Sequence, residues 1–324
     1  MVDVVLIEAI TLLVSLAILS KSSSLVVDNA TKLSKFFGIS QVAIGFILLS
    51  VATSLPELSV SVLSSNAGEG AIAAGNVFGS NIADILLVLG VGAFLYGIRI
   101  GKNELKDIAI ILVLTTIISA YIIFNSSITN QALGFLEGVI LILLFVLYIA
   151  YILRKKTVDG DGYKLITKKE AMYSFLIFSA AILLVLVSSS FVVDSAVKIA
   201  KLLNIAESFI GATIIAIGTS LPELSVDLQA IRKKQYGMAL GDAIGSTMTN
   251  ITLVLGTAAI INPITIILPI FIAALLFAII ANIVLLYVAA VNKKLQKLGG
   301  ALFLLLYLVF IVVIFYLQIG ELNI

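Results

Sequence analysis

The chain of 324 residues contains neither cysteine nor histidine. Without cysteine it can form no disulfide and no thiolate metal site, and without histidine it has no imidazole ligand. Any metal ion that it binds must therefore be held by oxygen atoms. Oxygen ligands suit hard cations such as calcium, magnesium and sodium.

Charged residues are also scarce, at 12% of the chain against about 25% in a typical soluble domain. Hydrophobic residues make up 61%. Apolar runs of about 20 residues, enough to cross the ~30 Å hydrocarbon core of a bilayer, recur along nearly the whole sequence. We therefore expect an all-α membrane protein in the lipid bilayer, without a sizeable soluble domain. The net charge of +2 suggests no nucleic-acid partner, and no obligatory protein partner is evident.

The apolar runs predict ten transmembrane helices in two halves. In the first half we expect spans at 3–35, 41–66, 70–96, 106–125 and 131–153. In the second half we expect spans at 171–202, 206–230, 236–262, 265–290 and 298–318. The polar stretch 154–170 is too short to fold alone. We interpret it as a cytoplasmic linker between a first transmembrane repeat, 1–153, and a second, 171–324.

The two halves carry the same polar motifs in an unbroken register. Ser22–Asp28 returns as Ser188–Asp194, and Thr53–Val60 (TSLPELSV) returns as Thr219–Val226, always 166 residues later. Each half has an odd number of expected spans, so the second half must enter the membrane from the opposite side. Inverted repeats of this kind are a transporter architecture in which the substrate site lies near the bilayer midplane.

Lysine and arginine crowd one side of this predicted topology. The loops on that side include the clusters Arg154–Lys156 and Arg232–Lys234, whereas the opposite side has only Lys198 and Lys201. The positive-inside rule places the basic side in the cytoplasm. We therefore expect a multi-pass protein of the cell membrane with both termini outside.

Glu57 in the first half and Glu223 in the second lie well inside expected spans at equivalent repeat positions. An ionisable residue there costs at least ~2.5–3.5 kcal/mol on insertion scales and usually faces a cavity or pathway. Inversion of the halves brings both glutamates close to the midplane. They are the first candidates for cation ligands; the alternative is a pair of neutral, hydrogen-bonded carboxyls that hold helices together.

A proline precedes each of these glutamates, Pro56 in the first half and Pro222 in the second. Proline has no N–H, so the carbonyl four residues earlier loses its helical partner. We expect the second and seventh helices to break around Thr53-Ser54 and Thr219-Ser220. Broken helices in transporters coordinate sodium through unwound carbonyls, and here the threonine and serine hydroxyls add further oxygens.

The third and eighth spans contain related segments, Gly75–Asp84 (GNVFGSNIAD) and Gly241–Asn250 (GDAIGSTMTN). In each segment a serine shares a helix face with a polar residue four positions later: Ser80 with Asp84, and Ser246 with Asn250. The glycines are spaced for close packing against the broken helices. Asn76 and Asp242 form a further equivalent pair, for which helix-packing hydrogen bonds are an equal alternative.

The combined set of oxygens can supply the six to eight ligands, at about 2.3–2.6 Å, that calcium prefers. Magnesium fits less well because it keeps its waters. Without a cation, like-charged carboxylates would lie close together in a medium of low dielectric constant, which disfavours ionisation of both. We therefore expect the protein to change its access only when it is loaded with one divalent ion, several monovalent ions or protons, which is antiport.

The two TSLPE motifs, together with the paired GN(x)2GS(x)3D and GD(x)2GS(x)3N segments, closely resemble the alpha repeats of the sodium/calcium exchanger family, prokaryotic type, in the calcium/cation antiporter superfamily. The resemblance covers essentially the whole chain. It implies a secondary active antiporter, not an enzyme, that exchanges calcium for sodium by alternating access. It also implies that the first and sixth helices slide across the other helices, and that no cofactor is needed beyond the transported ions.

By position, the resemblance also implies a set of ion ligands. The central calcium site would be built by Glu57, Glu223, Thr53 and Thr219. The flanking sodium sites would use the carbonyls of Ser50 and Ala216 with Ser80 and Ser246. Asp84 and Asn250 would line the middle position. Independently of the resemblance, the hydroxyls of Ser54 and Ser220 at the expected helix breaks are further candidate ligands.

Three other functions remain open on the sequence alone. A proton/calcium exchanger of the same superfamily could neutralise its carboxylates with protons, although the TSLPE hydroxyls suit sodium. A passive cation channel would need no counter-ion. An intramembrane aspartyl protease could use Asp242 with Asp194, but it would leave the duplicated glutamates unexplained.

Overall fold

The computed structural model describes residues 2–129, 133–154, 166–202 and 216–322, and these are almost entirely helical. Within these ranges eight helical runs are long and apolar enough to cross a membrane, or up to nine if one bent pair counts as a span. Six of the runs are single helices: α1 (Val2–Phe37), α7 (Lys102–Thr129), α8 (Phe135–Arg154), α9 (Lys168–Leu202), α15 (Leu268–Asn292) and α16 (Lys297–Leu322).

The other two runs are helices interrupted by a π-helical turn. The first comprises α5 (Gly70–Ile82), η2 (Ala83–Val88) and α6 (Leu89–Tyr96), and the second comprises α13 (Tyr236–Thr249), η4 (Asn250–Val254) and α14 (Leu255–Ile261). They are also the most enclosed of the eight, each with 78% of its apolar window buried. The π-turns contain Asp84 and Asn250, and such turns are frequent at functional sites.

The bent pair contains the first TSLPE motif. It is made of α2 (Gln41–Ile44), the π-helical η1 (Gly45–Leu49), α3 (Ser50–Thr53) and α4 (Leu55–Asn66). The chain bends by 45° between Thr53 and Leu55, with Pro56 in the first turn of α4. Proline is tolerated in a first turn because that turn has no use for its missing N–H.

The second TSLPE motif shows a similar interruption. The short α11 (Ala216–Thr219) is separated from α12 (Leu221–Arg232) by Ser220. The beginning of the expected span 206–230 lies outside the described residues, as do residues 131–132 of the span 131–153 and most of the expected linker. The remaining expected spans agree with observed helical runs to within a few residues.

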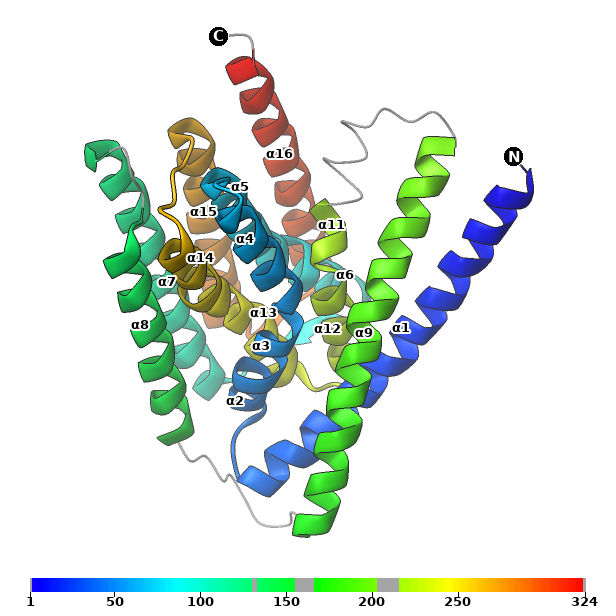
Figure 1. Ribbon diagram of the computed structural model, residues 1–324. Coiled ribbons are helices and arrows are strands. Elements are labelled where there is room, and N and C mark those ends of the chain that lie inside the picture. Colours follow the sequence, from blue (N-terminus) through cyan, green and yellow to red (C-terminus); the bar gives the residue numbers. More distant parts are fainter. Residues whose placement is uncertain (1, 130–132, 155–165, 203–215, 323–324) are drawn as a thin grey trace.

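Equivalent helices of the two halves run in opposite directions (Figure 1). In that view α1 descends and its counterpart α9 ascends, and α8 descends whereas α16 ascends. The start of α1 and the end of α16 lie at the upper end of the molecule, and the end of α8 and the start of α9 lie at the lower end. An even number of membrane crossings would place the two ends of the chain on one side in this way.

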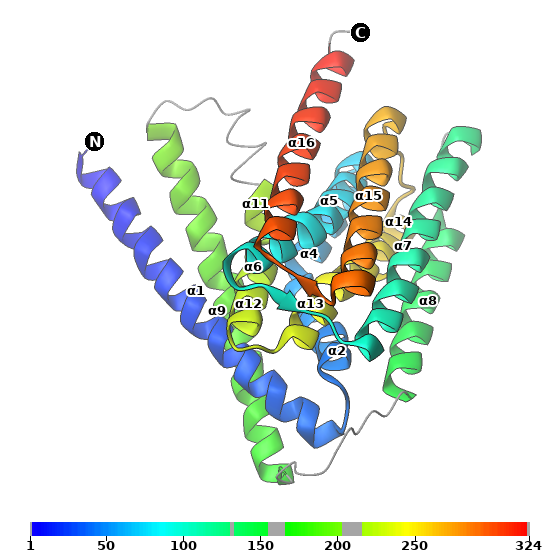
Figure 2. The same cartoon turned by 180° about the vertical axis from the view of Figure 1, so that it is seen from behind.

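Helices α1 and α9 pack along each other at one side of the bundle, as both views show (Figure 2). Lys198 of α9 forms an ion pair of 3.1 Å with Glu8 of α1. A small antiparallel ribbon that joins β1 (Ile98–Arg99) to β2 (Lys294–Leu295) lies in front in Figure 2. The two long helices therefore form a layer of their own against the other helices.

The outer surface of the molecule is apolar. Exposed hydrophobic side chains on the long helices include Leu136 (72%), Val312 (67%) and Leu183 (62%). Buried polar residues, by contrast, concentrate in α3–α5, α12 and α13. An apolar exterior around a polar interior is the arrangement expected where lipid, rather than water, contacts the protein.

Candidate cation-binding site

Glycines allow the two halves to approach each other closely at the centre of the bundle. A Cβ atom on Gly245 of α13 would lie 3.0 Å from the Cβ of Ser50 and 3.0 Å from the Cα of Phe46. Gly241, one turn earlier, packs directly on the backbone of Val42. The glycine spacing of the second half thus brings α13 against the segment that leads to the first TSLPE motif.

Glu57 lies in the first turn of α4 and is 1% exposed. Ser80 of α5 donates from Oγ to Glu57 Oε1 at 3.3 Å, and Asn76 donates from Nδ2 to the Glu57 carbonyl at 3.1 Å. Within the described ranges, Oε2 of Glu57 is buried without a hydrogen-bond donor. This helix pair therefore orients the carboxylate and leaves one of its oxygens available to a cation.

Glu223 occupies the same place in α12 and is also 1% exposed. Its carboxylate lies within electrostatic range of Glu57, Asp84 and Asp242. Like-charged groups at such separations in a medium of low dielectric constant repel one another strongly. The glutamates of the two halves therefore share one buried, negatively charged region, where a bound cation would offset the repulsion.

Thr53 ends α3 immediately before the bend, and its hydroxyl lies 3.0 Å from the Leu49 carbonyl and 3.3 Å from Asp242 Oδ1. A hydroxyl has one hydrogen to donate, so these two acceptors compete for it. The Ser50 hydroxyl bonds the Phe46 carbonyl and lies 3.2 Å from Thr249 Oγ1. The Ser50 carbonyl, a predicted sodium ligand, accepts the Ser54 N–H at 3.1 Å and keeps a second lone pair.

Asp84 and Asn250 lie at the two π-turns, and each is 1% exposed. Asn250 donates from Nδ2 to Asn81 Oδ1 at 3.2 Å. Its own Oδ1, and both carboxylate oxygens of Asp84, have no hydrogen-bond partner in the described part of the chain. Asp84 interacts electrostatically with Glu57 and Asp242. Both side chains thus contribute free oxygens to the same negative region.

The remaining predicted ligands are mostly buried hydroxyls. Ser54, Ser220 and Ser246 are enclosed, and their Oγ atoms lack hydrogen-bond partners among the described residues. Thr219 is half-buried at the end of α11, and Ala216 begins that helix. Across the described ranges, however, no three acidic side chains are close enough to hold one metal ion jointly. The structure gathers these oxygens into one region without closing them around a single point.

One buried acidic residue was not among the candidates predicted from the sequence. Asp227 lies one helical turn after Glu223 in α12, is 0% exposed, and has its carboxyl within hydrogen-bonding reach of the Asp242 carboxyl. The spacing of four residues from Glu223 was the available signal, since it places both side chains on one helix face. Among the residues that the structure describes, the interior therefore holds five buried carboxylates: Glu57, Asp84, Glu223, Asp227 and Asp242.

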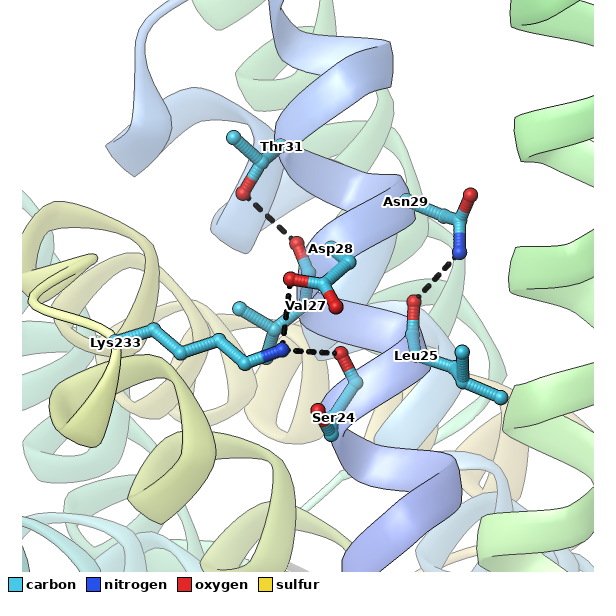
Figure 3. Close-up of polar contacts among 7 residues, drawn as sticks. All are labelled: Ser24, Leu25, Val27, Asp28, Asn29, Thr31 and Lys233. Carbon is cyan, nitrogen blue, oxygen red and sulfur yellow. Dashed lines mark hydrogen bonds and ion pairs between the residues drawn. The ribbon is translucent and has the colours of Figure 1, made fainter.

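Polar contacts join helix α1 to α12 and to the residue that follows it (Figure 3). Lys233, which follows α12, reaches Asp28 Oδ1 at 2.7 Å and donates to the Ser24 carbonyl at 2.8 Å. The hydroxyls of Ser23 and Ser225 lie 2.8 Å apart. The long helix is thus held directly by the element that carries Glu223.

Comparison with known proteins identifies the family. The family described as "Sodium/calcium exchanger protein" matches residues 7–154 and 173–316. An uncharacterized membrane protein, MJ0091, of Methanocaldococcus jannaschii is 31% identical over 92% of this chain and 94% of its own length. The sodium/calcium exchanger MaX1 of Methanosarcina acetivorans is 27% identical over 94% of this chain and 98% of its own.

A solved structure is also similar over nearly the whole chain. It is that of the sodium-calcium exchanger NCX_Mj soaked with sodium and without calcium, with a TM-score of 0.81, 29% identity, and coverage of 95% of this chain and 99% of that one. The family match covers both halves and includes the two TSLPE motifs. The chain therefore belongs to the sodium/calcium exchanger family, whose members are membrane transporters of sodium and calcium ions and not enzymes.

Proposed function

We propose that this protein exchanges calcium for sodium across the cell membrane by alternating access. The observation that carries the proposal is the pair Glu57 and Glu223, one buried carboxylate from each half, within electrostatic range of each other and each with an oxygen that lacks a donor. The similarity to MaX1 and NCX_Mj, both named as sodium/calcium exchangers, supports sodium as the counter-ion.

The proposed ligands follow the two repeats. Calcium is bound centrally by Glu57, Glu223, Thr53 and Thr219. Sodium is bound at flanking positions by the Ser50 and Ala216 carbonyls with Ser80 and Ser246. Asp84 and Asn250 complete the middle position, and the Ser54 and Ser220 hydroxyls line the breaks in the second and seventh helices.

The proposed architecture gives both faces of the membrane equivalent access to these ligands. Residues 1–153 and 171–324 form two inverted repeats of five helices each, joined by a cytoplasmic linker, 154–170. The opposite directions of α1 and α9 support this arrangement. Rocking or sliding of α1 and α9 against the other helices would expose the same carboxylates alternately to the two sides.

Charge explains why transport is an exchange. Empty, the interior would hold several mutually repelling carboxylates, whereas either one calcium ion or several sodium ions would offset that charge. Only the loaded forms can then pass through an occluded state at low cost. Two loaded forms that alternate give antiport, whereas a channel would need no such alternation.

Calcium flux in proteoliposomes tests the proposal. An outwardly directed sodium gradient should drive calcium uptake, and a pH gradient of equal size without sodium should not. Uptake driven by the pH gradient alone would identify a proton/calcium exchanger instead. Calcium flux that needs no counter-ion would identify a channel.

A further inference from the structure

The two halves differ at two neighbouring positions beside the glutamates. In the first half, Asn76 of α5 donates from Nδ2 to Ser61 Oγ at 3.0 Å and to the Glu57 carbonyl at 3.1 Å. The residues 166 positions later are Asp242 and Asp227. The amide of Asn76 therefore corresponds to the carboxylate of Asp242, and the hydroxyl of Ser61 corresponds to the carboxylate of Asp227.

These two carboxylates are enclosed completely. Asp227 and Asp242 are each 0% exposed, and their carboxyl groups lie within hydrogen-bonding reach of each other. Thr53 donates to Asp242 Oδ1 at 3.3 Å. Among the described residues, no donor reaches Oδ2 of Asp242 or either oxygen of Asp227. Three buried carboxylate oxygens thus lack donors at the two positions that Ser61 and Asn76 occupy in the first half.

A pair of ionised carboxylates in contact and away from water is strongly unfavourable unless a positive charge lies between them. In the parts of the chain that the structure describes, neither aspartate forms an ion pair with a lysine or arginine. The compensating charge must then come from outside the protein. Three open oxygens from two residues are fewer than the six to eight that calcium takes. The cation that the proposed function supplies besides calcium is sodium.

We propose that Asp227 and Asp242 form an additional sodium site, which rests on the proposed function and extends it. The site lies between α12 and α13, beside the central ligands, and Thr53 links Asp242 to the first TSLPE motif. Each time the sodium-loaded protein changes its access from one side of the membrane to the other, this site carries one further sodium ion. The protein should therefore carry one more sodium ion per calcium than a variant in which the pair has been removed.

The decisive variant replaces the two aspartates by the residues at the equivalent positions of the first half. Asp227→Ser with Asp242→Asn recreates the residues found at Ser61 and Asn76, so the side chains are known to fit a helix pair of this kind. The sodium-to-calcium coupling ratio is measured in proteoliposomes from the membrane potential at which net calcium flux vanishes under fixed ion gradients. We expect the ratio to fall by one sodium ion in the double variant.

The controls separate this inference from the proposed function. Glu69→Gln removes an exposed carboxylate outside the buried region and should keep the coupling ratio of the natural chain. If the natural chain exchanges calcium for sodium and the double variant keeps its ratio, the additional site is refuted alone. If the change in ratio follows pH and not sodium, the pair holds a proton and the proposal is also wrong. If the natural chain shows no sodium-driven calcium flux, both proposals fail.

If the double variant does not fold, a binding measurement on a single variant tests the site instead. The conservative variant Asp227→Asn keeps the size of the side chain and removes one charge. In the absence of calcium, sodium should raise the thermal unfolding midpoint of the natural chain with a higher Hill coefficient than that of Asp227→Asn. Equal Hill coefficients for the two proteins would overturn the additional site.

Discussion

At the scale of single residues, the paired glutamates carry the proposed transport. Glu57→Gln and Glu223→Gln each replace a buried carboxylate by an amide of nearly the same size. Disruption of a buried charge interaction costs about 3–5 kcal/mol, so each variant should lower sodium-driven calcium flux by at least ~100-fold. Proteoliposome flux measures the loss, and circular dichroism checks that the helices persist.

The conservative Glu69→Gln serves again as a matched control, because it makes the same chemical change at an exposed position. Its flux should equal that of the natural chain. Normal transport in either Glu57→Gln or Glu223→Gln would remove the basis of the proposed site.

At the scale of helices, α13 packs closely against the first half at Gly245. The equivalent glycine of the first half, Gly79, has open space around it. A Cβ on Gly245 would come within 3.0 Å of Ser50, whereas a Cβ on Gly79 would meet nothing within 4 Å. Gly245→Ala should therefore destabilise the protein by about 1–3 kcal/mol, as overpacking does. Gly79→Ala should be neutral or stabilising by up to about 1 kcal/mol, since alanine favours a helix.

Thermal unfolding in detergent compares the two glycine variants directly. The midpoint should fall for Gly245→Ala and hold or rise for Gly79→Ala. Equal shifts in both would mean that the close approach of α13 to the first half does not limit stability.

The contact between α1 and α12 is a second property of the helices. Lys233→Met removes the ion pair to Asp28 and the bond to the Ser24 carbonyl (Figure 3). Asp28 is 52% exposed, and a pair of this kind is worth about 0–1 kcal/mol. The described position of α1 should therefore lose population by up to about fivefold relative to its alternatives.

Spin labels on Ser20→Cys and Gln229→Cys can report that change, because the chain has no native cysteine and the two side chains are 3.1 Å apart. The short-distance fraction should decrease in Lys233→Met and be regained in the charge reversal Asp28→Lys with Lys233→Asp. The exposed Lys106→Met on α7 is the control and should leave the distances as they are. An unchanged distribution in Lys233→Met would show that this contact does not hold α1.

The sequence predicted the parts of the helical arrangement that depend on local chemistry. Pro56 before Glu57 indicated the interruption observed at Ser54, and the constant repeat offset paired Glu57 with Glu223. The contact between Asp227 and Asp242 could not be found in this way, because it depends on how α12 and α13 are rotated against each other. The π-turns at Asp84 and Asn250 likewise depend on tertiary packing that no local pattern encodes.

At the scale of the whole molecule, the distribution of charge and the directions of the helices constrain the orientation in the membrane. The start of α1, the end of α16 and the turn between α4 and α5 lie at one end, and the start of α9 lies at the other (Figure 1). The basic clusters favour the cytoplasm for the second end. A cysteine at Glu69 should then face the outside, and a cysteine at Thr167 should face the cytoplasm.

The absence of native cysteine makes this orientation directly measurable. A membrane-impermeant maleimide added to intact cells should label Glu69→Cys, and it should label Thr167→Cys only after the membrane is permeabilised. The opposite labelling pattern would mean that the protein lies in the membrane in the inverse orientation. The outer and inner ends of the proposed ion pathway would then be exchanged. Because the two halves are inverted copies, such a reversal would leave the central carboxylates in place and change only which side each flanking sodium position faces.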